Sequence, residues 1–162
     1  MIYEDFVVGA SHPLGAHRFT VEEIRRFALA YDPQPFHIDE EAAKASLFGG
    51  LCASGWHTAS VMMGLLSRTF ARFDEQARSA GRPSAALGPS PGFDDLKWLR
   101  AVYPGDTITF ASEVVGKRPS ASRPGWGLVT IKATGVNQDG QRVFAVTAHV
   151  FAVVTRPDAG PE

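Results

Sequence analysis

The chain has 162 residues, of which 44% are hydrophobic and 20% are charged, and its formal net charge is −1 at pH 7. This length fits one domain, because domains usually contain about 100–200 residues, and it allows a core without stabilising disulfides. A charge so close to neutral excludes binding to nucleic acid or anionic membranes through overall charge, so an anionic ligand would need a local site.

The N-terminal segment, MIYEDFVVGA, lacks the basic start and long apolar core of a secretory signal. Glycine, serine and threonine interrupt the longest run without Asp, Glu, Lys or Arg, residues 45–67, whereas a membrane helix needs about 20 predominantly apolar residues. The one cysteine, Cys52, rules out an internal disulfide and fits a reducing compartment. We therefore expect a cytoplasmic protein that does not enter the membrane, with one domain over residues 1–155 and a flexible tail over residues 156–162.

The first predicted helix covers residues 20–31, TVEEIRRFALAY. Its apolar residues fall on one helical face. Thr20 is a suitable N-cap, and Glu23 stands where it would complete a capping box. Because Pro33 disfavours helical geometry at Asp32, the helix should end there.

A short helix and a long central helix are expected next. Asp39 can cap the short one, over residues 40–45. Ser54 can cap the central one, which opens with SGWHTASVMMGLL and has no charge on any face over residues 58–66. A helix that is apolar all round is buried on all sides, so other elements of the domain should wrap around it.

The second half of the chain is predicted to supply a sheet. Residues 74–92, rich in Ala, Arg, Ser, Gly and Pro, are expected to form a loop. Three later segments show strand patterns: residues 107–115, 128–136 and 142–155. Turn signals precede the first of them, at Pro104-Gly105, and join the last two, at Asp139-Gly140. The pattern predicts an α+β domain in which an antiparallel sheet curls around the central helix.

Asp32 and His37 lie in the bend DPQPFH between the first two helices. Two prolines stiffen this bend, and the two side chains meet only if the loop curls back. A carboxylate and an imidazole held together can take a proton and return it. The residues alone leave another interpretation open, in which Asp32 ends one helix and His37 packs before the next.

The stretch DPQPFH, followed by FGGLCASGWHT, resembles the MaoC-like acyl dehydratases, the (R)-specific enoyl-CoA hydratase type of hot dog fold. The signature of that family is Asp-x-Asn-Pro-x-His, followed by a short helix and a glycine that opens the central helix. The later stretch DDLKWLRAVYPGD looks like the family's entry into the sheet. The resemblance implies a single hot dog domain that acts on acyl-CoA or a related thioester as a homodimer or a larger homo-oligomer. It implies no metal, flavin or nicotinamide cofactor. The near-neutral charge and the interrupted apolar run predict no nucleic acid or membrane partner.

By this resemblance, Asp32 and His37 are the catalytic residues and hold a water molecule between them. Water would add to a trans-2-enoyl thioester to give an (R)-3-hydroxyacyl thioester, or leave in the reverse reaction. Ser54 and Gly55 would bind the substrate, because a glycine near the N-terminus of the central helix lets a thioester oxygen approach free N–H groups. The alternative for Gly55 is a tight turn into the helix, with Ser54 as its cap.

Three residues depart from the family pattern. Gln34 stands at the position of the signature asparagine, and Tyr31 stands where a small residue is usual before the aspartate. Met63 or a neighbour replaces a serine that related hydratases carry in the central helix. These departures argue against a standard short enoyl substrate.

The sequence gives less support for a catalytic or binding role of the other polar residues. His57 could face the site or be a buried core histidine, and His149 is expected to be structural. Nothing near His12 and His17 in the sequence completes a set of metal ligands. The spacing of His, Cys and carboxylate residues does not predict a zinc site, and Cys52 is best interpreted as a small apolar residue. Basic residues beyond the central helix could bind coenzyme A phosphates or simply face solvent: Arg68, Arg72, Arg78, Arg82, Lys97 and Arg100.

Two other functions stay open at this point. A hot dog acyl-CoA thioesterase would use the same helix N-terminus but direct water to the carbonyl carbon. A non-catalytic acyl-binding subunit would keep the pocket without using the Asp32–His37 pair.

Overall fold

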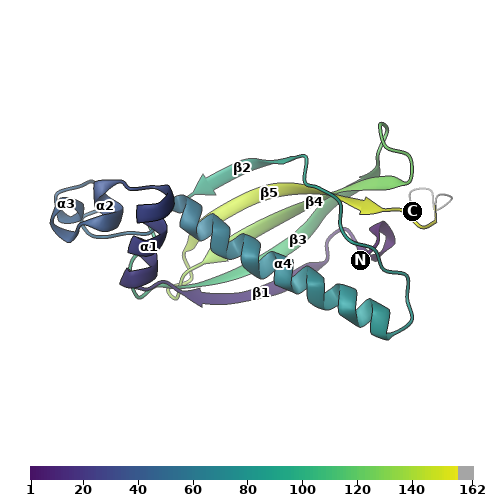
Figure 1. Cartoon of the computed structure of the whole chain (residues 1–162), viewed down its shortest axis with the longest axis horizontal. Coiled ribbons are helices and arrows are strands. Elements are labelled where there is room, and N and C mark those ends of the chain that lie inside the picture. Colours follow the sequence, from purple (N-terminus) through teal and green to yellow (C-terminus); the bar gives the residue numbers. More distant parts are fainter. Residues whose placement is uncertain (157–162) are drawn as a thin grey trace.

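Helix α4 (Gly55–Ser79) lies along one face of a five-stranded antiparallel sheet in the computed structural model, which describes residues 1–156 (Figure 1). The strands follow the order β1–β3–β4–β5–β2 across the sheet. Their bounds are Ser11–Arg18 for β1, Gly92–Trp98 for β2, Thr107–Pro119 for β3, Trp126–Val136 for β4 and Arg142–Val153 for β5. The predicted antiparallel sheet around a central helix is therefore confirmed. The tail prediction falls largely on residues 157–162, outside the described residues.

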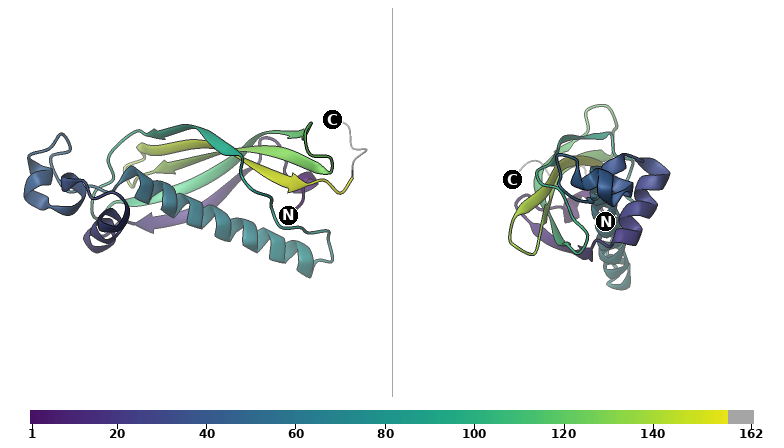
Figure 2. Two further views of the ribbon diagram at one scale, coloured as in Figure 1. Left: turned by 45° about the horizontal axis from the view of Figure 1, so that its top comes forward. Right: turned by 90° about the vertical axis from the view of Figure 1, so that its left-hand side faces the viewer.

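The sheet curves partly around α4, and three short helices gather beyond one end of it (Figure 2). These are α1 (Val21–Tyr31), α2 (Pro35–Ile38) and α3 (Glu40–Lys44), and the N-terminal end of α4 points toward them (Figure 1). A short 3-10 helix, η1 (Tyr3–Asp5), precedes β1. The fold thus places the bend between α1 and α2 next to the start of the central helix.

Local sequence signals account for the ends of these helices. The Thr20 side chain accepts a hydrogen bond from the N–H of Glu23 at the start of α1, and the Asp39 side chain accepts one from Ala42 at the start of α3. Both N-cap predictions are confirmed, because each cap satisfies an N–H that the helix itself leaves free. The one-turn helix α2 begins at Pro35, whose fixed φ suits the first helical position.

Helix α4 differs from the prediction in length. It runs to Ser79, so the loop predicted from residue 74 is wrong at its start, and the connection to β2 covers residues 80–91. Within the added turn, Arg78 pairs with Asp74 across one helical turn, with 3.0 Å between Nη2 and Oδ2. Such i,i+4 pairs favour a helix over a loop by a few tenths of a kcal/mol, about 0.2–0.5.

The prediction that α4 is buried on all sides is also wrong for this chain. The sheet covers one face, and a stripe beside that face stays open along a groove between α4 and the sheet, with Met63 52% exposed. The stripe follows the i, i+3, i+4 spacing of one helical face: Trp56, Ser60, Met63, Ser67 and Ala71. An uncharged surface of this kind is available to a ligand or to another chain.

The three predicted strands form the centre of the sheet and a large part of the core. Strands β4 and β5 pair through a tight connection in which Gly140 has φ +75°, as the Asp139-Gly140 signal predicted. Alternating side chains of β3 and β4 point toward α4, among them Ile108, Phe110 and Val129, all fully buried. The strands β1 and β2 complete the two edges of the sheet.

Candidate active site

Asp32 and His37 face each other in the bend between α1 and α2. Asp32 is the C-cap of α1, and the N–H of Gln34 donates back to the Asp32 carbonyl, so the chain turns at once. Helix α2 then brings the His37 ring to within 3.5 Å of the carboxylate, measured from Nε2 to Oδ2. Arg25 of α1 holds the two parts together by donating to the Ile38 carbonyl at 3.1 Å. The structure therefore contains the face-to-face geometry that the two-proline bend allowed.

The hydrogen bond on the other side of the imidazole determines which nitrogen faces Asp32. The Nδ1 atom lies 2.7 Å from the Cys52 carbonyl oxygen. A carbonyl can only accept, so Nδ1 carries the proton and donates. In the neutral ring, Nε2 then presents a lone pair toward a carboxylate that is itself an acceptor. A molecule with donor hydrogens, such as water, can join the two.

The two side chains differ in their exposure. The His37 residue is 6% exposed, whereas the Asp32 side chain is 24% exposed. The imidazole is thus fixed in a buried position, and the carboxylate can be reached from outside. A carboxylate and an imidazole in this arrangement suit proton transfer to and from a small molecule held between them.

Ser54 connects this pair to the start of α4. Its hydroxyl donates to Asp32 Oδ2 at 2.7 Å and accepts from the Trp56 N–H at 3.2 Å. The predicted N-cap is thereby confirmed. That Ser54 also binds substrate stays a prediction; the residue is 0% exposed, and both of these contacts are internal. Ser54 is connected to the candidate site by its hydrogen bond to Asp32.

Gly55 lies under the indole of Trp98. A Cβ built on Gly55 would come within 2.4 Å of the Trp98 ring, so no other residue fits here without moving the indole. The Trp98 ring also meets that of Trp56 edge to face, with centroids 5.2 Å apart. The space that the sequence assigned to a ligand is therefore occupied by an aromatic side chain, and a thioester would reach the Gly55 backbone by displacing or flanking it. In the sequence, only the glycine indicates a close contact at this position. Its partner, Trp98, is 43 positions away, and no sequence spacing predicts it.

His57 belongs to the contact between α1 and α4. It is 6% exposed, its ring stacks on Phe27 with centroids 4.7 Å apart, and Nε2 lies 3.8 Å from Glu23 Oε1. Burial lowers the pKa of His57, an effect that the Glu23 carboxylate opposes. Of the two interpretations that the sequence left open, these contacts favour the buried packing role.

A groove of about 630 Å³ runs between α4 and the sheet. Its lining is mostly apolar and includes Trp56, Met63, Leu66, Phe70, Phe93 and Phe144. It begins one residue after Gly55, and Met63, one of the departures from the family pattern, lies on its open side. The groove thus extends along α4 from Trp56, in the first turn of the helix, and its lining does not include Asp32 or His37.

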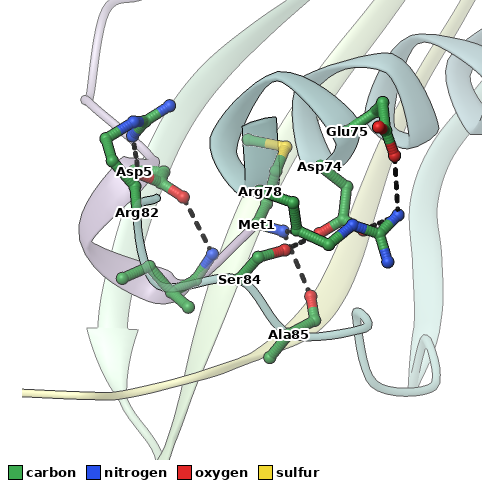
Figure 3. A network of polar contacts seen from close by, with 9 residues as sticks. Met1, Asp5, Asp74, Glu75, Arg78, Arg82, Ser84 and Ala85 are labelled. Carbon is green, nitrogen blue, oxygen red and sulfur yellow. Dashed lines mark hydrogen bonds and ion pairs between the residues drawn. The ribbon is translucent and has the colours of Figure 1, made fainter. Parts of the chain in front are cut away.

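A polar network lies at the far end of this groove. The amino group of Met1 donates to Asp74 at 2.6 Å and to the Ala85 carbonyl at 3.1 Å, and Arg78 bridges Asp74 and Glu75 (Figure 3). Met1, Asp74 and Ala85 all line the groove. This end is therefore marked by charged and polar groups, in contrast to its apolar length.

Several of the basic residues expected beyond the central helix lie within it. Arg68, Arg72 and Arg78 lie on α4 itself, and Arg82 pairs with Asp5 at 3.1 Å in the connection that follows (Figure 3). Lys97 lies 3.4 Å from Asp95. Arg78, Arg82 and Lys97 thus already have carboxylate partners.

The remaining histidine and cysteine candidates have structural surroundings. His149 lies between Thr130 and Asp94, at 3.1 and 2.9 Å. Cys52 is buried, and burial raises the pKa of its thiol to about 11.

Among residues 1–156, the structure brings together no group of three or more His, Cys, Asp or Glu residues that could hold a metal ion. None of the helices within the same range is long and apolar enough to cross a membrane.

A curved antiparallel sheet around one central helix defines a hot dog fold. The chain matches the MaoC like domain family over residues 12–137, and it belongs to that family. The structure resembles the MaoC-like dehydratase from Rhodospirillum rubrum, with a TM-score of 0.79 and 36% identity, covering 96% of this chain and 99% of the other.

Two other solved structures are similar. One is a monoamine oxidase regulatory protein from Archaeoglobus fulgius, with a TM-score of 0.79 and 28% identity over 96% of each chain. The other is the (R)-hydratase from A. caviae involved in PHA biosynthesis, with a TM-score of 0.68 and 25% identity over 91% of this chain and 97% of the other. The family and the hot dog fold that the sequence suggested are therefore confirmed.

Proposed function

We propose that the protein is an acyl-thioester hydratase or dehydratase. It adds water to a trans-2-enoyl-CoA-type substrate to give an (R)-3-hydroxyacyl thioester, or catalyses the reverse. The observation that carries this proposal is the 3.5 Å approach of two acceptors, His37 Nε2 and Asp32 Oδ2, with His37 oriented by the Cys52 carbonyl. The (R)-hydratase from A. caviae, similar over most of its length, supports the same reaction class.

In this proposal, water lies between Asp32 and His37 and donates a hydrogen to each. One of the two groups takes a proton as the water oxygen bonds to Cβ, and a proton is delivered to Cα, so that the elements of one water molecule are added. Dehydration runs through the same groups in reverse. Positioned acid–base groups of this kind contribute typically about 10²–10⁴-fold in rate.

The start of α4 would stabilise the negative charge that develops on the thioester oxygen. Ser54 accepts from the N–H groups of Trp56, His57 and Thr58, through its hydroxyl and its carbonyl. Ser54 provides no acceptor for the remaining N–H group of the first turn, that of Gly55. This group lies at the positive end of the helix dipole, where negative charge is stabilised. One donor aimed at such an oxygen contributes about 3–4 kcal/mol. No separate cofactor is needed, because the substrate brings its own thioester.

The groove along α4 would receive the acyl group, since it is apolar and its lining begins at Trp56, in the first turn of the helix. The edge strand β2 favours association with a second copy, because an uncovered edge strand is normally covered in solution. We therefore expect a homodimer or a larger homo-oligomer. Sedimentation velocity measurements would show only the 17.4 kDa monomer if this expectation is wrong.

The proposal is tested with the variants Asp32→Asn and His37→Ala. Each should lower the rate of enoyl-thioester hydration about 10²–10⁴-fold while the fold is kept, because each removes one half of the proton-transfer pair. Loss of enoyl absorbance measures this rate. Asp95→Asn is the matched control, since Asp95 is exposed on β2 and asparagine tolerates its positive φ of 51°.

The same assay separates the alternative functions. A thioesterase would release free thiol without loss of the double bond, and its activity would contradict the hydratase proposal. A non-catalytic acyl-binding subunit would bind thioesters with equal affinity in wild type and both variants and would turn over none of a broad panel.

A further inference from the structure

The Ser54 hydroxyl holds the Asp32 carboxylate through an oxygen that also faces His37. Asp32 Oδ2 lies 2.7 Å from Ser54 Oγ and 3.5 Å from His37 Nε2. Ser54 is fully buried, whereas Asp32 belongs to a bend and keeps part of its side chain exposed. A single carboxylate oxygen thus joins a buried serine to the reacting side of the histidine.

The direction of this hydrogen bond follows from its surroundings. The backbone N–H of Trp56 can only donate, so the Ser54 oxygen accepts from it at 3.2 Å. The carboxylate can only accept, so the single hydroxyl proton of Ser54 goes to Asp32. Trp56, Ser54 and Asp32 therefore form a chain in which every donor and acceptor has one possible role.

This chain restrains the torsion that sets the orientation of the carboxylate. The χ2 angle of aspartate is broad and has roughly two-fold symmetry, so a carboxylate without a partner rotates. Because Ser54 is 22 positions from Asp32 and caps α4, the same bond also fixes the carboxylate relative to Gly55. The hydrogen bond therefore fixes the position of the Asp32 carboxylate, at the end of α1, relative to the Gly55 N–H, at the start of α4.

From this geometry we infer that Ser54 is a positioning residue, which orients Asp32 toward the reacting molecule and sets its distance from the start of α4. The inference rests on the proposed hydratase function for its kinetic consequences, and on the structure alone for the orientation of Asp32. Ser54 does not itself touch the substrate.

The test compares Ser54→Ala, Ser54→Thr and the cap control Thr20→Ala. Ser54→Ala should lower kcat by roughly tenfold to a hundredfold with KM changed less than about threefold, because a misplaced catalytic group affects turnover more than binding. Ser54→Thr keeps the hydroxyl and should recover most of kcat. Thr20→Ala removes the N-cap hydroxyl of α1, a bond to Glu23 rather than to Asp32, and should lower Tm without lowering kcat.

A double variant separates positioning from a general loss of stability. If Ser54 acts through Asp32, adding Ser54→Ala to Asp32→Asn should lower the residual rate less than twofold, because groups that act as a unit are not additive. An unchanged kcat in Ser54→Ala, or a full additional loss in the double variant, would overturn the inference.

Crystal structures of wild type and Ser54→Ala give a second readout that needs no activity. A carboxylate of Asp32 that rotates or splits into two orientations in the variant supports the inference, and one that keeps its wild-type orientation overturns it. If the wild type hydrates no thioester in the panel, the proposed function fails, and this structural comparison still decides the role of Ser54.

Discussion

A backbone carbonyl determines what His37 can do. The Cys52 oxygen accepts from Nδ1 at 2.7 Å, and this acceptor is a backbone group that does not ionise. The neutral imidazole therefore presents Nε2 to Asp32 in one tautomer, as a general base requires. The identity of residue 52 matters for this contact mainly through the position of its backbone.

The thiol of Cys52 should be inert in the folded protein. Burial raises its pKa to about 11, so the thiolate that reacts with alkylating agents is scarce near neutral pH. At pH 8 we expect labelling by iodoacetamide to be at least about a hundredfold slower in the native protein than in the same protein unfolded in guanidinium chloride. Mass spectrometry of quenched samples measures both rates. Equal rates would show that the residue is accessible and its thiol unperturbed.

At the scale of elements, the contact between α1 and α4 supports the candidate site. Phe27 of α1 stacks on His57 of α4 with an angle of 8° between the rings, and Asp32 ends α1 five residues later. A disturbance at His57 would therefore be transmitted to the position of Asp32. Glu23 lies beside the ring, and His17 and Arg26 are the other charged or titratable groups near it.

Acidification should loosen this contact. The pKa of His57 is lowered by burial from its ordinary value of 6.5, so below pH 6.5 the unfolded chain binds more protons than the folded one. The free energy of unfolding therefore falls as the pH drops from 6.5 through the folded-state pKa. Urea titrations at pH 7, 6 and 5 should show this fall in wild type and a smaller one in His57→Gln.

His12→Gln is the matched control for that experiment, since His12 lies on β1 and packs against Phe73 instead of α1. It should retain the pH dependence of the wild type. A His57→Gln variant that loses as much stability on acidification as the wild type would show that other groups cause the effect.

At the scale of the whole molecule, the groove along α4 determines which acyl groups fit. From Trp56 to Ala71 the helix rises about 22 Å, at 1.5 Å per residue, and both residues line the groove. Such a length accommodates acyl chains well beyond four carbons. The polar network around Met1 and Asp74 marks where apolar contact ends (Figure 3).

Activity should therefore rise with acyl-chain length. Each buried methylene contributes about 0.8 kcal/mol, so kcat/KM should increase about threefold to fourfold per methylene until the groove is filled. Ala148→Phe, which fills the groove from β5, should abolish this rise while a four-carbon substrate keeps kcat/KM within about threefold.

Thr147→Phe provides the control, because successive residues of a strand point to opposite faces of the sheet and Thr147 lies outside the groove lining. This variant should keep the full dependence on chain length. Identical chain-length profiles for wild type and Ala148→Phe would contradict the assignment of the groove to the acyl chain.

The sequence by itself determined the elements whose causes are local. Thr20, Asp39 and Ser54 cap their helices because a hydroxyl or carboxylate reaches an N–H two or three residues ahead, and the Asp139-Gly140 turn joins its strands for a similarly short-range reason. The bend at Asp32 and His37 was also local, since prolines set its geometry. The family resemblance followed from this same short stretch.

Only the tertiary structure decided the contacts between distant segments. The Cys52 carbonyl on His37, the Ser54 hydroxyl on Asp32 and the Trp98 indole on Gly55 join residues 15, 22 and 43 positions apart, and no periodicity encodes which of them meet. The open face of α4 is a further case, because a helix without charge looks buried all round until the sheet is seen to cover one side. Short-range hydrogen bonds and torsional limits act within a few residues, whereas packing depends on where the whole chain places each surface.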